Sequence, residues 1–124
     1  MSKKPNKSRK AFYTMPKHKA VKAIASHLDE KLSKEFGKRS ISVRKGDTVK
    51  VMRGTDKGKE GKITAVDTTK GRIFIEKLTL IKSNGKEKLI PIQPSNVLVI
   101  DLDRTDRKRF KNAVKVAVKT AEKK

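Results

Sequence analysis

The sequence predicts a mainly β fold: a small barrel of five or six short strands, with a helical extension before it and a basic helix after it. Most of the β-branched residues lie between positions 41 and 102, where they alternate with polar residues. Glycine-containing turns separate these runs, and short strands joined by tight turns favour a small barrel. The flanking segments carry apolar residues at three- and four-residue steps, the period of a helix. We therefore divide the chain into residues 1–40, 41–102 and 103–124.

The first segment is a basic extension with one or two short helices. The stretch up to Lys10 is rich in lysine and poor in apolar residues, so we expect it to be disordered when free. A helical period then begins at Pro16 and continues to Leu28. Residues Ser26 to Asp29 have the pattern of a capping box, which predicts a second helix that ends at Gly37.

Strands are expected in the middle segment wherever apolar and polar residues alternate, namely at 47–53, 61–67, 72–76, 79–83, 86–90 and 96–100. Turn residues separate them: Gly54, Gly58 and Gly61 after the first strand, and Asn84 with Gly85 between the fourth and fifth. The glycines would also let the backbone approach a phosphate, but turns and bulges require positive φ regardless of a ligand. The tight Asn84–Gly85 turn argues against a large protrusion.

The last segment is expected to form a basic amphipathic helix that Thr105 or Asp106 caps. Its apolar residues follow helical spacing, and Lys and Arg occupy the other faces. Because the apolar face is mostly Ala and Val, it would insert weakly into a membrane, so RNA or a neighbouring protein is the expected partner. The apolar positions are Phe110, Ala113, Val114, Ala117, Val118 and Ala121.

The charge of the chain points to a polyanionic partner. Lys and Arg number 34 against 13 Asp and Glu, and the net charges of the three segments are +9, +6 and +6. The total of +21 exceeds the magnitude of about 2 to 8 that solubility requires. Nucleic acid is the leading candidate. No apolar run approaches the roughly 18 residues of a membrane-spanning helix, and no secretory signal is evident, so we expect a cytoplasmic protein.

Catalysis, metal binding and cofactors have no positive evidence. Cysteine is absent, and His18 and His27, the only histidines, do not by themselves make a metal site. Asp47, Asp56 and Glu60 lie among lysines, and ion pairing is expected for them rather than acid–base catalysis. We therefore expect a protein that is not an enzyme.

Aromatic residues are few, which favours recognition of the backbone and shape of folded RNA over reading of single-stranded bases. The chain has four Phe and one Tyr. Phe36, Phe74 and Phe110 are expected in the core. Phe12 and Tyr13 lie in a basic stretch, and two interpretations stay open for them: stacking on a base or packing on the barrel.

Residues Val43 to Val66, with the sequence VRKGDTVKVMRGTDKGKEGKITAV, resemble the KOW motif. KOW domains are SH3-like barrels of ribosomal proteins and some transcription elongation factors. The flanking sequences resemble the archaeal and eukaryotic form of ribosomal protein L-twenty-four, whose eukaryotic name is L-twenty-six. Residues about 8–102 carry this resemblance, through Ser8–Tyr13, Pro16–His18, Ser26–Leu28, Gly37–Ser40 and Ile92–Val97.

The resemblance implies a structural constituent of the large ribosomal subunit that binds ribosomal RNA early in assembly, near the exit of the nascent-chain tunnel. Neighbouring large-subunit proteins are implied partners, and no homo-oligomer is expected. Two alternatives remain: a KOW transcription or translation factor that cycles on and off, and a nucleoid or chromatin packaging protein. The residues that the resemblance places against RNA are Arg9, Lys10, Lys17, His18, Arg39, Arg44, Lys45, Arg53, Lys57, Lys59 and Lys62.

Overall fold

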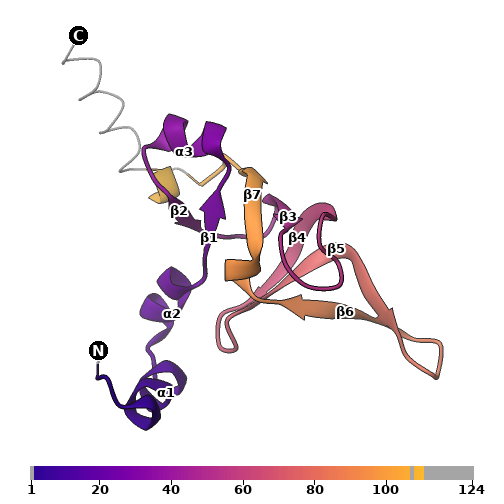
Figure 1. Ribbon diagram of the computed structural model, residues 1–124, viewed down its shortest axis with the longest axis horizontal. Helices are drawn as coiled ribbons and strands as arrows, with labels where there is room; N and C mark the ends of the chain where they lie inside the picture. The colour runs from indigo at the N-terminus through magenta and orange to yellow at the C-terminus, as the bar shows by residue number, and fades with distance from the viewer. Residues whose placement is uncertain (1, 107, 111–124) are drawn as a thin grey trace.

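The protein is mainly β, with short helices in its N-terminal part (Figure 1). The structure is a computed structural model that describes residues 2–106 and 108–110, so the helix expected up to residue 124 lies mostly outside the described residues. The elements in chain order are α1 (Pro5–Tyr13), α2 (Lys17–Ala23), β1 (Ala25–Leu28), α3 (Glu30–Phe36), β2 (Ser40–Ser42), β3 (Thr48–Val51), β4 (Glu60–Asp67), β5 (Arg72–Ile81), β6 (Glu87–Ile92), the 3₁₀ turn η1 (Pro94–Asn96) and β7 (Val97–Asp101).

The strands form one sheet in the order β2-β1-β7-β3-β4-β5-β6. Strands β3 to β6 follow each other as an antiparallel meander, and β7 returns to pair antiparallel with β3. On its other side β7 pairs parallel with β1, so the N-terminal segment adds two strands to the sheet. The mainly β prediction is confirmed. The described residues form seven strands rather than five or six, and their pairings leave β2 and β6 as two ends instead of closing a barrel.

Alternation of apolar and polar residues positions the core. Val49 and Val51 in β3, Ile73 and Ile75 in β5, and Val99 in β7 are at most 2% exposed, while the residues between them are half-buried or exposed. Each such side chain contributes about 1.5 to 3 kcal/mol when it is fully removed from water. The strands that the sequence predicted therefore carry the most deeply buried part of the core, and Leu28 of β1, Leu32 of α3 and Ile41 of β2 extend it.

The helix expected from Pro16 to Leu28 ends early. Helix α2 stops at Ala23, and after Ile24, its C-cap, residues Ala25–Leu28 form β1. Ser26 was expected to cap a helix, but its side chain is buried in β1, and its hydroxyl donates a 2.6 Å hydrogen bond to the carbonyl of Pro94. Helix α3 spans Glu30–Phe36, and Gly37, with a φ of 60°, is its left-handed C-cap, as expected.

The first residues are helical, contrary to the expected disorder. Helix α1 starts at Pro5, a residue suited to the first helical position, and continues through residues with good helix propensity such as Lys, Arg and Ala. None of its residues is buried. Local propensity rather than burial in the core therefore explains this helix. No helix among residues 2–106 and 108–110 has the length and apolar character needed to cross a membrane.

Strands β5 and β6 form a hairpin that projects from the sheet (Figure 1). The two strands expected at 72–76 and 79–83 are one strand, interrupted by an irregularity where Lys77 has a φ of +66°. Beyond Ile75, β5 pairs with β6 alone, because its described pairing with β4 ends there. Thr79 lies opposite Leu89, one residue from the expected register. The tight turn at Asn84–Gly85 had put a large protrusion in doubt, and the structure shows that this hairpin does project.

Candidate nucleic-acid interface

Few of the cations in the described part of the chain are paired with carboxylates. The described residues form five ion pairs. Asp47, Asp56 and Glu60 each take part in one, which confirms the ion pairing expected for these carboxylates. The pairs are Arg44–Asp106, Lys50–Glu60, Lys59–Asp56, Arg104–Glu35 and Arg109–Asp47.

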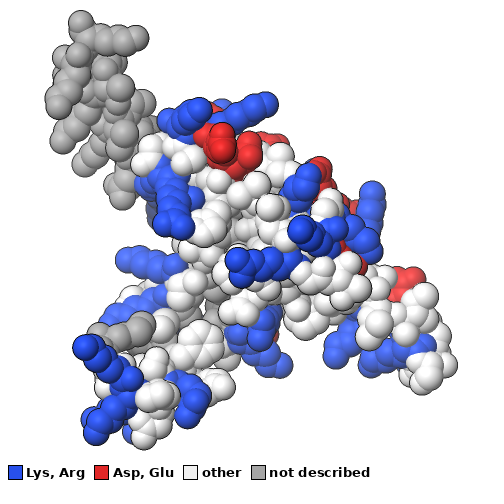
Figure 2. Space-filling view, viewed as in Figure 1, with Lys and Arg blue, Asp and Glu red and all other residues white. Residues whose placement is uncertain are grey.

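All eleven residues that the resemblance placed against RNA are exposed. Four lie on α1 and α2, three lie between α3 and β3, and four lie on the β3–β4 loop and the start of β4. Arg44 and Lys59 have carboxylate partners, whereas none of the other nine has an acidic group within 4.0 Å among the residues that the structure describes. Figure 2 shows Lys and Arg over the α1–α2 arm, the middle of the molecule and the β5–β6 hairpin. Acidic residues lie near α3, and a few more lie among the basic ones on the right side of the view.

The β3–β4 loop presents one group of these residues, Arg53, Lys57, Lys59 and Lys62, which we call the β3–β4 cations. Backbone hydrogen bonds hold the base of the loop, from the N–H of Val51 to Lys59 O at 2.9 Å and from the N–H of Gly58 to Val51 O at 2.8 Å. Gly54 and Gly58 have φ values of +99° and +89°, with no atom within 4 Å of an added Cβ. Glycine is therefore required at both positions by the backbone conformation and not by crowding.

Gly61 has a different role from the turn that the sequence suggested. It lies within β4, and its φ is not positive. A Cβ atom on Gly61 would lie 2.8 Å from Cγ2 of Ile75 and 2.9 Å from the carbonyl oxygen of Glu76. Close packing between β4 and β5 thus excludes a side chain at this position.

The buried carboxylate of Asp47 joins the segment after β7 to the sheet. Its Oδ1 accepts hydrogen bonds from the N–H of Asp103 at 3.1 Å and from Nη1 of Arg109 at 2.9 Å. Its Oδ2 accepts from the N–H of Arg44 at 2.8 Å and from Nη2 of Arg109 at 2.5 Å. Asp47 is 0% exposed and the Arg109 side chain 4% exposed. Three of these four hydrogen bonds, from Asp103 and Arg109, therefore attach the segment after β7 to the sheet, and the fourth holds the turn before β3.

One further contact supports this docking, and local hydrogen bonds order the segment itself. The rings of Phe36 and Phe110 stack with centroids 5.1 Å apart and pack partly buried against the core, close to their expected place. Asp103 accepts hydrogen bonds from the hydroxyl and the N–H of Thr105, which lower the pKa of the Asp103 carboxyl below 3.8, its ordinary value. The Asp106 carboxylate accepts the N–H of Lys108 at 3.0 Å, as an N-cap would.

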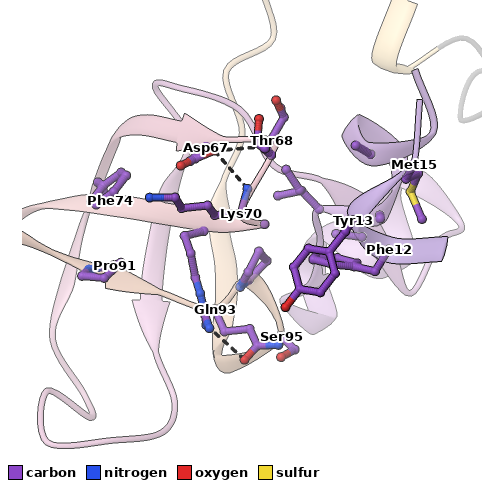
Figure 3. A pocket seen from close by; sticks show the side chains of 18 of the residues that line it. Phe12, Tyr13, Met15, Asp67, Thr68, Lys70, Phe74, Pro91, Gln93 and Ser95 are labelled. Carbon is purple, nitrogen blue, oxygen red and sulfur yellow. Dashed lines mark hydrogen bonds between the residues drawn. The ribbon is translucent and has the colours of Figure 1, made fainter. Parts of the chain in front are cut away.

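A cavity that the sequence did not predict lies between the N-terminal helices, the β4–β5 turn and η1. Its volume is about 890 Å³, and Phe12, Tyr13, Lys70, Gln93 and Ser95 are among its lining residues. In Figure 3, Phe12 and Tyr13 enter the cavity from the helical side. The Phe12–Tyr13 pair in a basic stretch was the one sequence signal for this cavity. The rest of the cavity could not be predicted, because its walls come from segments some 80 residues apart. Phe74, expected in the core, is half-buried and lines this cavity.

No cluster of three metal-ligating side chains occurs within residues 2–106 and 108–110. His18 lies exposed on α2, and His27 lies exposed on β1. The structure therefore offers no metal centre in its described part, and the basic surface and the cavity are its candidate sites.

A small mainly β protein with this excess of exposed cations has the character of a ribosomal protein. A family model that describes the eukaryotic ribosomal proteins L-twenty-six and their archaeal counterparts L-twenty-four matches residues 2–115. Because the match covers more than half of the chain, the chain belongs to this family. It is a structural ribosomal protein of the large subunit and takes part in translation. The resemblance that the sequence motifs carried is confirmed.

Proposed function

We propose that this protein binds large-subunit ribosomal RNA by neutralising its phosphates with the eleven exposed basic residues named above. One observation carries the proposal: nine of these residues have no carboxylate within 4.0 Å in the part of the chain that the structure describes. Unpaired cations on a chain of charge +21 repel each other until a polyanion binds. Membership of the ribosomal family supports RNA as that polyanion.

Two parts of the molecule have different tasks in this proposal. The KOW domain of residues 41–102, with its motif at residues 43–66, is a rigid anchor. It holds the β3–β4 cations on a loop fixed by backbone hydrogen bonds and on the start of β4. The α1–α2 arm lies outside the core and has no buried residue, so it can enter RNA clefts without disturbing the fold. Each phosphate that a cation neutralises releases condensed counterions, and this release drives binding.

Family membership also supports the finer features of the proposal. These are binding early in subunit assembly, a position near the exit of the nascent-chain tunnel, and contacts with neighbouring large-subunit proteins. The chain acts as one copy in the ribosome and catalyses no reaction in this proposal. The segment from residue 103 onward, which Asp47 and Arg109 attach to the sheet, is the part that we expect to meet a protein neighbour.

Sedimentation tests this function. Tagged protein expressed in a host with matching ribosomes should sediment with large subunits and stay bound after a high-salt wash. A structural constituent holds many phosphate contacts at once, whereas a factor that cycles on and off is released. Protein that remains at the top of the gradient after the wash would contradict the proposal and favour a transient KOW factor.

A further inference from the structure

Phe12 and Tyr13 are neighbours in α1 but have different surroundings. The Phe12 ring lies against the β4–β5 turn, since its Cζ would be 3.4 Å from a Cβ on Gly71. Tyr13 is 78% exposed, and its ring meets that of Phe12 edge to face with centroids 5.8 Å apart. Of the two interpretations open from the sequence, packing on the sheet fits Phe12. Tyr13 is left with an aromatic surface that the described residues do not cover.

The walls of the cavity beside Tyr13 are positively charged. Lys70, Arg72 and Lys88 line it, all are exposed, and none has a carboxylate within 4.0 Å among the described residues. Among the described residues, Asp67 is the only acidic one that lines the cavity, and its Oδ1 already accepts the N–H groups of Thr69 at 3.0 Å and Lys70 at 3.1 Å. The cavity is therefore complementary to an anionic ligand.

Polar groups on the wall opposite α1 can form hydrogen bonds with the edge of a nucleobase. The side-chain oxygen of Gln93 accepts a 3.2 Å hydrogen bond from Arg72, which fixes the amide and leaves its NH₂ group as a donor. Ser95 adds a hydroxyl that can donate and accept. In Figure 3 both residues lie on the side of the cavity opposite the helix that carries Phe12 and Tyr13. The volume of about 890 Å³ is within the range of about 300 to 1,000 Å³ typical of ligand pockets.

We propose that this cavity receives an unstacked nucleobase of ribosomal RNA, which stacks on Tyr13 while Lys70 and Lys88 contact the flanking phosphates. The inference rests on the proposed RNA binding and adds a specific contact to it. Proteins that recognise RNA in loops and bulges stack splayed bases on aromatic rings, and here the aromatic ring, the cations and the hydrogen-bonding groups converge. Charge complementarity favours this ligand over an apolar protein segment.

The chain contains one tyrosine, so a label on tyrosine reports on Tyr13 alone. Full-length protein made with 3-fluorotyrosine should give one ¹⁹F resonance for that residue. On addition of the large-subunit RNA fragment that the protein protects from nuclease, we expect an upfield shift, because a stacked base adds its ring current. Inorganic polyphosphate and a fully paired RNA duplex of equal length are the controls, and neither should produce the shift.

Variants test the energy of the contact. Tyr13→Leu should weaken binding of the protected fragment about 5- to 150-fold, the effect of losing one base–aromatic contact, while Tyr13→Phe should bind like wild type. The salt dependence of Tyr13→Leu should be unchanged. Lys70→Gln should reduce the slope of log K against log salt by about 0.7 to 0.9. Thermal unfolding of each variant shows whether the fold is kept, and exposure of Tyr13 predicts that it is.

The outcomes separate this inference from the proposed function. RNA binding without an upfield shift, or with the same shift for duplex and polyphosphate, overturns the base contact and leaves phosphate binding intact. Equal affinities of wild type and Tyr13→Leu also overturn it, and would favour a protein neighbour at this cavity. Failure of the protein to bind the RNA at all overturns the proposed function and the inference together.

Discussion

The substitution Asp47→Asn tests how the chain holds its C-terminal segment. Asp47 is 0% exposed and accepts four hydrogen bonds, two of them from Arg109. The change removes the negative charge and turns one acceptor into a donor that faces the N–H groups of its partners. Arg109, whose side chain is 4% exposed, would remain as a buried charge without a counterion. Breaking a buried pair in this way costs about 3 to 5 kcal/mol.

An exposed pair on the same sheet supplies the matched control. Lys50 and Glu60 lie 3.0 Å apart with side chains 41% and 51% exposed. Glu60→Gln removes the same charge but leaves both groups in water, so it should cost about 0 to 1 kcal/mol. Urea denaturation of wild type and both variants, followed by circular dichroism at one salt concentration, gives the free energies of unfolding.

A double variant shows whether the cost comes from the unpaired charge. Arg109→Met keeps much of the apolar volume of the side chain, so Asp47→Asn combined with Arg109→Met should be less destabilised than the two single changes added together. The reasoning is refuted if Asp47→Asn loses no more stability than Glu60→Gln. Strict additivity of the two single changes would show that Asp47 and Arg109 do not act as a pair.

Three further predictions concern the sheet, the loop and pH. Gly61→Ala should destabilise the fold by about 1 to 3 kcal/mol, because its Cβ would lie 2.8 Å from the buried Ile75 side chain; an unchanged urea midpoint would contradict the packing. Replacing all four β3–β4 cations by Gln should reduce the slope of log K against log salt for ribosomal RNA by about 3, and an unchanged slope would exclude them from the interface. The lowered pKa of Asp103 means that its contribution to stability is complete above pH 3.8 and is lost as pH falls through the lower folded value. The difference in melting temperature between wild type and Asp103→Asn should therefore shrink below about pH 4, and a constant difference would refute the assignment.

The strands of residues 41–102 could be predicted because apolar and polar residues alternate along them in the same way as buried and exposed positions do. Val49 and Val51 are buried and their neighbours are not, so the pattern in the sequence is the pattern in the fold. Strand β1 could not be recognised in the same way. Its buried positions include Ser26, which satisfies its hydroxyl through Pro94, a partner 68 residues away. Because Ser26 is polar, the alternation of apolar and polar residues expected of a strand is not visible in the sequence. The remaining apolar residues, Ile24 and Leu28, are four residues apart, which is the spacing of a helix.

The basic surface could be predicted, because it depends on composition. The cavity could not, because it depends on contacts between residues that are far apart in the sequence. Excess positive charge and the KOW-like loop predicted which residues face a polyanion. The β3–β4 cations are exposed, and their contact with RNA stays a prediction. The cavity beside Tyr13 is different, because Gln93 and Ser95 reach it only after β7 returns to β3 and β1 pairs with β7. The number of strands was underestimated for the same reason, since β1 and β2 depend on that pairing.

Competition between large-subunit ribosomal RNA and duplex DNA, measured with the full chain over a series of salt concentrations, tests the central claim most directly. Cations arranged for a folded RNA should keep their preference for ribosomal RNA at every concentration, and the preference should increase as added salt weakens non-specific attraction to DNA. Duplex DNA that competes equally throughout would show that the basic surface recognises charge alone, and the account of an RNA-binding ribosomal constituent would be contradicted.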